Sequence, residues 1–270
     1  MTETEAQDLE FSLPPVLAAF FEEIEALETD EEGGPEGLPS PLLGHAMARL
    51  GEVPELADLF VAEEGGPMPW TYEKITAMAT EAIEAKLGSL GITVDRLTFT
   101  EAAEQMPWAW GVWQGGLDPL SEERSSDDAL FRDLAAVILW RRYDIDQPCG
   151  EELFDTIDAG YVLLDDGKTE DACRLWLMLW KRLERHLDDG VSTLEEIDDL
   201  YGLLGELGAW AAEALPEALA TAVDEGLPFG DALVAWIDRF QVRFCEEDPE
   251  LIVELRALRD EIAEIPRAEA

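Results

Sequence analysis

Residues 154–180 read FDTIDAGYVLLDDGKTEDACRLWLMLW. Apolar side chains recur every three or four positions on both sides of Asp165-Asp166-Gly167, the spacing of two amphipathic helices joined by a turn. A connection this short makes consecutive helices pack antiparallel. The stretch therefore predicts a helical hairpin, with helices over residues 150–164 and 168–187.

The same periodicity continues through the rest of the C-terminal half. A helix is predicted at 128–143, with Asp127 or Ser126 as its cap. Further helices are predicted at 192–204, about 206–224, 229–245 and 249–264. Strands and helices do not alternate anywhere in the sequence, which argues against α/β architectures. We therefore expect an all-α fold built from antiparallel helical hairpins.

The N-terminal half predicts shorter helices between breaks rich in Gly, Pro and acidic residues. Helices are predicted at 14–28, 42–50, 54–63 and 71–90. A further polar break, GGLDPLSEERSSD, occupies residues 115–127. The chain is therefore predicted to divide into an N-terminal helical region at 1–117, with acidic Gly/Pro loops, and a C-terminal helical region at 127–265.

Residues 92–99, ITVDRLTF, have strand-like composition. They are equally compatible with a loop that leads into a helix capped by Thr100. One short strand without a partner cannot form a sheet, so we favour the loop.

The charge of the chain is its most unusual property. It contains 62 Asp and Glu against 18 Lys and Arg, for a formal net charge of -44. Three interpretations stay open: adaptation to a salt-rich cytoplasm, mimicry of nucleic acid, and ordinary acidity with no special role. Repulsion on this scale destabilises a compact fold unless salt screens it. Salt adaptation therefore predicts that stability rises steeply between low and molar salt.

The composition also argues against several classes of partner and location. Direct binding to DNA, RNA or anionic lipid is disfavoured, because such binding depends on Lys and Arg. Residues 1–10 are acidic and polar, unlike a signal peptide. No apolar run reaches the length of a membrane span. We expect a cytoplasmic protein that does not associate with membranes.

The sequence predicts no catalytic site and no cofactor. A nucleophile needs a base and an orienting group within reach, and His45 and His186 are interpreted as structural or solvated residues. Paired acids such as Asp198-Asp199 are so common in this chain that they do not mark a cation site or a pair of glycosidase carboxylates.

The cysteines do not indicate a metal site either. Cys149, Cys173 and Cys245 are far apart and have no CxxC spacing, so neither a disulfide framework nor a zinc site is expected. Buried free thiols are the expected state.

Aromatic residues supply one set of interaction candidates. The segment PWAWGVW, residues 107–113, carries Trp108, Trp110 and Trp113. These form either an aromatic binding surface or, as we favour, a helix end packed into the core. The later stripe of Trp140, Trp176 and Trp180 is interpreted as core packing between hairpins.

Basic residues supply a second set of interaction candidates. Arg141 and Arg142, together with Lys181, Arg182 and Arg185, form the main concentration of positive charge in the sequence. They either bridge acids on adjacent helices, which we favour, or anchor an acidic segment of a partner.

Residues 154–180 resemble a tetratricopeptide repeat (TPR). That repeat has a Gly where two helices approach, a small residue at the hairpin contact and a large aromatic four positions on, here Gly160, Ala172 and Trp176. Leu163 replaces the usual aromatic residue, and the terminal Pro is absent. The resemblance implies that the hairpins stack as a TPR-like/α-solenoid array.

A broader resemblance covers roughly residues 128–264. The runs LAAVILWRRYDIDQPCGEELFDTIDAGYVLLDDGKTEDACRLWLMLWKRLERHL and AWIDRFQVRFCEEDPELIVELRALRDEIAE resemble the helical region of a family of uncharacterised prokaryotic proteins that often carry a SEC-C zinc motif. The Cys-x-Cys and Cys-His cluster of that motif is absent from this sequence. The resemblance implies a TPR-like scaffold without a metal site, and it implies no activity.

The sequence favours a non-enzymatic helical-repeat scaffold or adaptor that binds a partner protein. Two alternatives stay open: an acidic nucleic-acid mimic that inhibits a DNA-binding protein, and an enzyme whose site is assembled from scattered carboxylates. A mimic predicts acids along one face at about one charge per 1.7 Å, the spacing of duplex phosphates. An enzyme predicts a deep pocket that encloses several acids.

Overall fold

The computed structural model describes residues 45, 69–113, 117, 126–201 and 206–264. Regular structure in this part of the chain is entirely helical, which confirms the predicted all-α class. The helices predicted at 14–28, 42–50 and 54–63 lie outside the described residues, apart from His45, which is helical. Among the helices described, none combines the length and the apolar character that a membrane crossing requires.

The N-terminal group of helices surrounds α6. It consists of α3 (Tyr72–Thr76), α4 (Thr80–Ser89), α5 (Arg96–Ala103), the 3₁₀-helix η2 (Trp110–Trp113) and α6 (Ser126–Arg142). In α6, Phe131 and all residues from 134 to 140 are buried, as expected of a helix that is covered on every side. Helices α3, α4 and η2 pack against it. The buried apolar side chains from Ile75 to Cys149 form one cluster, the N-terminal core.

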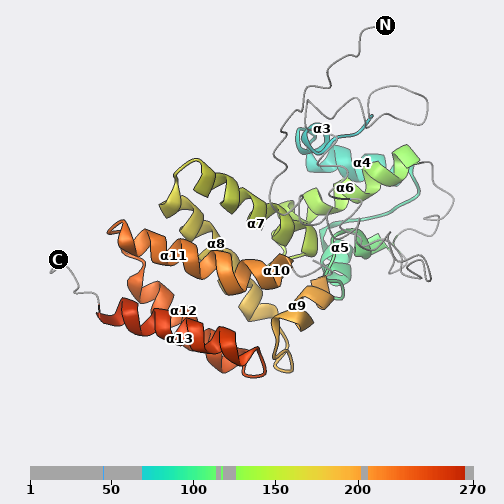
Figure 1. Cartoon of the computed structure of the whole chain (residues 1–270). Coiled ribbons are helices and arrows are strands. Elements are labelled where there is room, and N and C mark those ends of the chain that lie inside the picture. The colour runs from blue at the N-terminus through green and yellow to red at the C-terminus, as the bar shows by residue number, and fades with distance from the viewer. Residues whose placement is uncertain (1–44, 46–68, 114–116, 118–125, 202–205, 265–270) are drawn as a thin grey trace, which may run out of the picture.

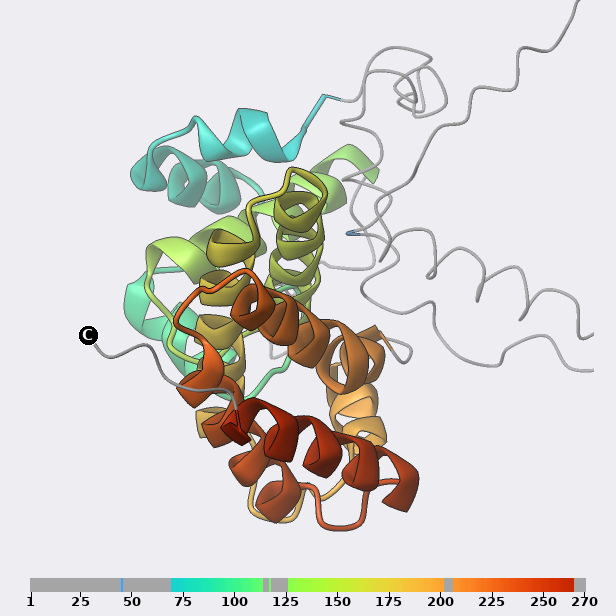
Figure 2. The same cartoon turned by 60° about the vertical axis from the view of Figure 1, so that its left-hand side comes forward.

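The C-terminal group is a series of hairpins. It consists of α7 (Gly150–Asp165), α8 (Thr169–His186), α9 (Leu194–Tyr201), α10 (Glu206–Ala209), the π-helix η4 (Trp210–Ala214), α11 (Leu215–Asp224), α12 (Gly230–Arg243) and α13 (Pro249–Glu264). Helix α7 packs on α8, α8 on α11, α11 on α12 and α12 on α13. The buried apolar side chains from Leu153 to Ile262 form a second cluster, the C-terminal core. Figures 1 and 2 show α3 and α4 at one end of the described chain and the α12–α13 pair at the other.

Most helices of the C-terminal half occupy the predicted ranges. Helices α7, α8, α12 and α13 begin and end within two residues of their predicted bounds. Helix α6 also lies within two residues of its predicted range, but its predicted cap is wrong, because the helix begins at Ser126 and so includes both proposed cap residues, Ser126 and Asp127. The predicted boundary at 115–127 lies largely outside the described residues, and the division into two regions stays a prediction.

The single helix predicted at 71–90 is wrong, because the chain breaks between α3 and α4. The Arg142 guanidinium of α6 donates from Nη2 to the Thr76 carbonyl at 2.7 Å and from Nη1 to the Thr80 hydroxyl at 3.3 Å. In a continuous helix the amide of residue 80 would bond that carbonyl. The Arg142 guanidinium therefore supplies the hydrogen-bond donor for the Thr76 carbonyl at the end of α3. The break between the two helices needs neither Gly nor Pro.

The loop interpretation of residues 92–99 is confirmed, but the predicted cap is wrong. Helix α5 begins at Arg96 and Asp95 is its N-cap, with Oδ1 accepting from the Thr98 amide at 2.9 Å. The Thr98 hydroxyl accepts from the Asp95 amide at 3.1 Å, which completes a capping box. The bond from the Thr98 amide to the Asp95 carboxylate, followed by one that the Thr98 hydroxyl donates to the same carboxylate, lowers the pKa of Asp95 below its ordinary value. Thr100 lies inside the helix.

The α7–α8 hairpin requires a glycine at residue 160. A Cβ on Gly160 would lie 1.8 Å from Nε1 of Trp176, which is fully buried. The same indole nitrogen donates to the Ile157 carbonyl at 3.2 Å. Gly167 in the turn has a φ of 70°, a conformation that favours glycine.

A π turn joins α10 to α11. The Leu215 amide donates to the carbonyl of Trp210, five residues earlier. Pro216 follows directly, and it has no N–H for the carbonyl of Ala212 four residues before it. The wider turn lets the helix continue past the proline, and it moves the side chains on either side of the turn out of α-helical register.

Candidate functional site

The three tryptophans of residues 107–113 do not form one surface. Trp113 is 2% exposed and packs edge to face on Phe99 in the N-terminal core, with ring centroids 5.9 Å apart. Trp110 is half-buried against the same core, whereas Trp108 packs against the C-terminal core. The segment therefore lies where the two cores meet.

A buried carboxylate fastens this segment to α7. Glu151 is fully buried and accepts from the amides of Ala109 at 2.8 Å and Trp110 at 3.1 Å. The Gly150 amide donates to the Pro107 carbonyl at 2.8 Å. Glu151 thus caps the start of η2 from a distant part of the chain, a structural use of an acid.

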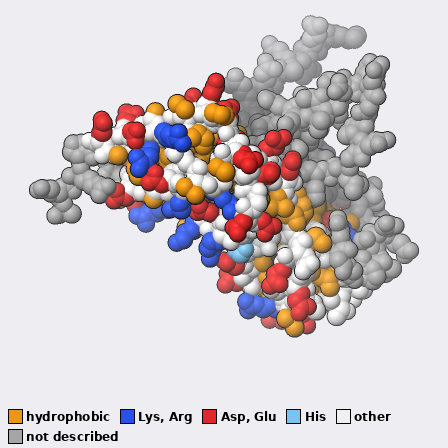
Figure 3. Space-filling view, turned by 90° about the horizontal axis from the view of Figure 1, so that it is seen from below, with side chains coloured by type: hydrophobic (Ala, Val, Ile, Leu, Met, Phe, Trp, Pro, Cys, Tyr) orange, Lys and Arg blue, Asp and Glu red, His pale blue; other side chains and the backbone are white. Residues whose placement is uncertain are grey.

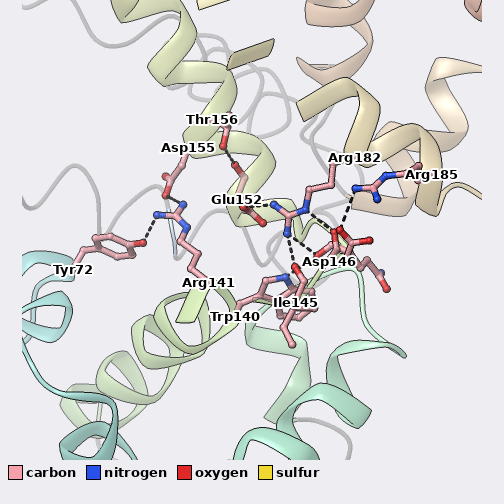
Figure 4. Close-up of polar contacts among 11 residues, drawn as sticks. Tyr72, Trp140, Arg141, Ile145, Asp146, Glu152, Asp155, Thr156, Arg182 and Arg185 are labelled. Atoms are coloured by element: carbon pink, nitrogen blue, oxygen red, sulfur yellow. Dashed lines mark hydrogen bonds and ion pairs between the residues drawn. The ribbon is translucent and has the colours of Figure 1, made fainter. Parts of the chain in front are cut away.

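Arg141 links three elements. It donates to the Tyr72 hydroxyl of the N-terminal group and to Oδ2 of Asp155 on α7 at 2.8 Å (Figure 4). Buried His45 contacts the other oxygen of Asp155 at 2.9 Å through Nε2. Burial is the largest single influence and disfavours the charge on Arg141, but the attraction of Asp155, Tyr72 and Glu152 and the hydrogen bond to Asp155 together outweigh it and raise the pKa of Arg141. Arg142, in contrast, bonds the Thr76 carbonyl and the Thr80 hydroxyl, and it forms no ion pair with an acid of the described residues.

Basic residues of α8 hold the connection between α6 and α7 (Figure 4). Arg182 donates to Glu152 at 2.6 Å and to the carbonyls of Ile145 and Asp146 at 2.6 and 2.5 Å. Arg185 lies 3.1 Å from the carboxylate of Asp146. The predicted bridging role is therefore observed for Arg141, Arg182 and Arg185, whereas Lys181 is exposed.

The aromatic stripe is also divided between the cores. Trp176 and Trp180 lie in the C-terminal core, as predicted, and Trp180 contacts Trp236 at a centroid distance of 5.6 Å. Trp140 lies in the N-terminal core, so its assignment to packing between hairpins was wrong. Its indole nitrogen donates to the Gln147 carbonyl at 2.8 Å.

Two of the three cysteines are buried as predicted. Burial raises the pKa of Cys149 well above its ordinary value and that of Cys173 to about 11, which keeps both as thiols. Cys245 is exposed, which contradicts the prediction. No group of three or more His, Cys, Asp or Glu side chains in the described part of the chain is arranged to hold a metal ion.

A groove lies between α9, the α10–η4 bend and the start of α13, and we call it the α9–α13 groove. It has a volume of about 530 Å³. Four apolar residues line it, and we call them its floor, namely Leu194, Ala209, Ala212 and Leu251. Five acidic residues also line it, namely Glu195, Asp198, Asp199, Glu213 and Glu247, and we call the exposed three, Glu195, Asp199 and Glu213, its rim. Among the described residues that line it, none is Lys, Arg or His.

Two of these acids accept hydrogen bonds from the helix ends that border the groove, and we call these helix ends its walls. Asp198 accepts from the amides of Leu207 at 3.0 Å and Gly208 at 2.7 Å, at the start of α10. Glu247 accepts from the Leu194 amide at 2.7 Å, at the start of α9. The other three acids, Glu195, Asp199 and Glu213, are exposed.

Most of the groove lining, from Leu194 to Glu213, belongs to a stretch without positive charge. Every charged side chain between His186 and Arg239 is Asp or Glu. On the face shown in Figure 3, acids are scattered widely, whereas Lys and Arg gather in the left and central parts of the view. The sequence interpretation missed this site, although the long run without Lys or Arg and the Pro216 that accompanies the π turn were visible signals.

A second groove, of about 670 Å³, lies between the α8–α9 loop and α12. Its lining mixes acids with Arg239 and Arg243, which lie 3.3 and 3.7 Å from Glu184 and Asp189, respectively. Its charges are thus partly neutralised within the chain, unlike those of the α9–α13 groove.

The whole sequence was compared with protein-family models and with curated proteins, and the fold was compared with solved structures. None of the three comparisons gives a match.

Proposed function

We propose that this chain is a non-enzymatic helical scaffold that binds a partner protein, and that the α9–α13 groove is the contact site. The groove is the observation that carries the proposal. It combines an apolar floor with an acidic rim, and binding sites commonly combine apolar surface with a few oriented polar groups.

The roles of three acids, two buried and one half-buried, support a scaffold over an enzyme. Glu151 and Asp198 each accept two backbone amides, and Glu247 accepts a backbone amide of α9. A carboxylate whose lone pairs are engaged in this way orders the backbone and is poorly placed to transfer protons. The buried acids are therefore better explained by folding than by catalysis.

The packing order of the C-terminal helices supports a TPR-like stack. Each long helix contacts the next along α7, α8, α11, α12 and α13. The close approach at Gly160 and Trp176 has the small-to-large complementarity of that repeat. Stacked hairpins of this kind provide extended binding surfaces.

The experiment that tests the proposal is affinity purification of the full chain at several salt concentrations from low to molar. Each recovered protein is then purified and mixed with the chain, and the complex is measured by light scattering. We expect one partner that forms a complex of fixed stoichiometry. Failure to reconstitute a complex with any recovered protein at any salt concentration would overturn the scaffold proposal.

Residues 187–238, in which every charged side chain is Asp or Glu, favour a second candidate function, a mimic of nucleic acid. A mimic occupies the DNA-binding surface of its target, so duplex DNA and the chain must compete for it. Addition of duplex DNA to the purified complex distinguishes the two. A scaffold partner stays bound, whereas the target of a mimic is displaced.

A further inference from the structure

We infer that the α9–α13 groove binds a cationic segment of the partner protein in which one or two apolar side chains are flanked by Lys or Arg. This inference rests on the proposed function and adds the chemistry of the occupant.

The floor requires an apolar anchor. The floor supplies aliphatic surface from Leu194, Ala209, Ala212 and Leu251. The groove volume of about 530 Å³ is enough for a few side chains of a bound segment. A wholly hydrophilic occupant would leave this apolar surface wet. Burial of an aliphatic side chain there removes it from water and supplies binding energy that salt does not screen.

The rim requires positive charge. Glu195, Asp199 and Glu213 are exposed, and within the described part of the chain none of them forms an ion pair or a side-chain hydrogen bond. Elsewhere in the C-terminal half, acids pair with Arg, as Asp238 does with Arg259 at 2.6 Å. The rim acids are thus unpaired within the described residues, and their charge favours Lys and Arg on either side of an apolar residue.

Hydrogen bonds within the chain fix the walls of the groove without a bound segment. Asp198 and Glu247 tie the starts of α10 and α9 through backbone amides. The π turn, η4, places Ala212 and Glu213 in the lining, and π turns occur frequently at functional sites. Rigid walls reduce the entropy lost on binding.

The inference is tested by selection of random twelve-residue peptides displayed on phage against the full chain. We expect the enriched sequences to share an apolar residue flanked by Lys or Arg. The most enriched peptide is then labelled, and its affinity is measured by fluorescence anisotropy. Failure to enrich any sequence, or enrichment of acidic or uncharged sequences, would overturn the inference.

Matched variants locate the binding site. Asp199→Lys combined with Glu213→Lys reverses the rim, and we expect peptide affinity to fall at least about tenfold. Glu217→Lys combined with Asp224→Lys makes the same charge change on exposed residues of α11 that do not line the groove, and should reduce affinity far less. Ala209→Trp fills the groove without a change of charge and should also weaken binding. Equal losses in the two double variants would place the peptide elsewhere.

Three further results separate the inference from the proposed function. If spermine displaces the peptide at equal concentration, the groove is a site for small polycations and the inference is wrong. If the purified partner binds the rim double variant as tightly as the parent chain, the scaffold function stands but its contact lies elsewhere. If no partner forms a complex but the peptide binds the groove, the function fails while the binding chemistry holds.

Discussion

In the N-terminal core one long helix, α6, is enclosed by short helices and loops, whereas in the C-terminal core long helices pack on one another in sequence. The short elements are fixed by polar contacts from distant residues, such as Arg142 on the Thr76 carbonyl and Glu151 on the amides of η2. The C-terminal core is centred on aromatic rings, with Trp180 in contact with Trp210, Trp236, Phe240 and Phe244.

The difference shows two ways to stabilise helices in an acidic chain. A long amphipathic helix gains enough from burial of its apolar face. A helix of one or two turns does not, because most of its backbone groups lie at its ends and lack partners within the helix. Side chains from elsewhere in the chain satisfy those groups, and the N-terminal half depends on them.

The largest expected effect is on the free energy of unfolding, when the central aromatic ring of the C-terminal core is removed. Trp180→Ala should lower the free energy of unfolding by about 3–5 kcal/mol, because it removes a buried ring that touches four others. Hydrogen exchange should rise first in α8, α11 and α12, while α6 keeps its protection. Met178→Ala, at a residue of α8 that is 67% exposed, is the control and should change stability by less than about 0.5 kcal/mol. An equal rise of exchange in both groups would show that the two cores unfold as one unit.

Gly160→Ala tests the close approach within the α7–α8 hairpin. The added Cβ would overlap the buried indole of Trp176, so stability should fall by about 1–3 kcal/mol in a urea titration. Gly88→Ala in α4 is the matched control, since a Cβ there meets nothing within 4 Å. This control should gain about 0.5–1 kcal/mol from the reduced entropy of the unfolded chain. A neutral Gly160→Ala would mean that the helices can separate at no cost.

Glu151→Gln tests the junction between the cores. The amide keeps the shape of the side chain but faces the Ala109 or Trp110 N–H with a donor, which leaves a buried donor unpaired. Stability should fall by about 1–3 kcal/mol, measured by chemical denaturation. Glu101→Gln, at an exposed residue of α5, makes the same chemical change and should be nearly neutral. If the two variants behave alike, the buried carboxylate does not stabilise the junction.

Arg142→Gln tests how the break between α3 and α4 is held. Loss of the guanidinium removes the hydrogen bonds to Thr76 and Thr80, and stability should fall by about 1 kcal/mol. Amide exchange should accelerate around residues 77–80. Lys181→Gln changes the net charge equally at an exposed position of the C-terminal group and controls for repulsion. Unchanged exchange at the break would contradict the proposed role of Arg142.

The smallest expected effect concerns Asp146 in the connection between the two groups. Its hydrogen bond to His186, aided by Arg185, lowers the pKa of Asp146. The lowered pKa stabilises the fold above the unfolded value of about 3.9, and this contribution is lost as the pH falls through the folded pKa. The stability difference between the parent chain and Asp146→Asn should therefore shrink below about pH 4. A difference that stays constant from pH 6 to pH 2 would argue against this linkage.

Much of the fold could be predicted from periodicity, but the residues at the ends of the short helices could not. The bounds of α13 follow from Asp248-Pro249 and the apolar repeat after it. The break between α3 and α4 has no local signal, because its partner Arg142 is 66 residues from Thr76. The interaction candidates were harder still, since Trp108 and Trp113 are close in sequence but pack against different cores.

The amino-acid sequence alone determined the helical periodicity, the turns of the C-terminal hairpins and the excess of negative charge, because each depends on neighbouring residues or on composition. Only the tertiary structure decided which acids are buried and which stay exposed. Asp198 and Asp199 are adjacent and chemically identical, yet Asp198 is buried and caps α10, whereas Asp199 is exposed. Their difference depends on backbone amides that only folding brings within reach.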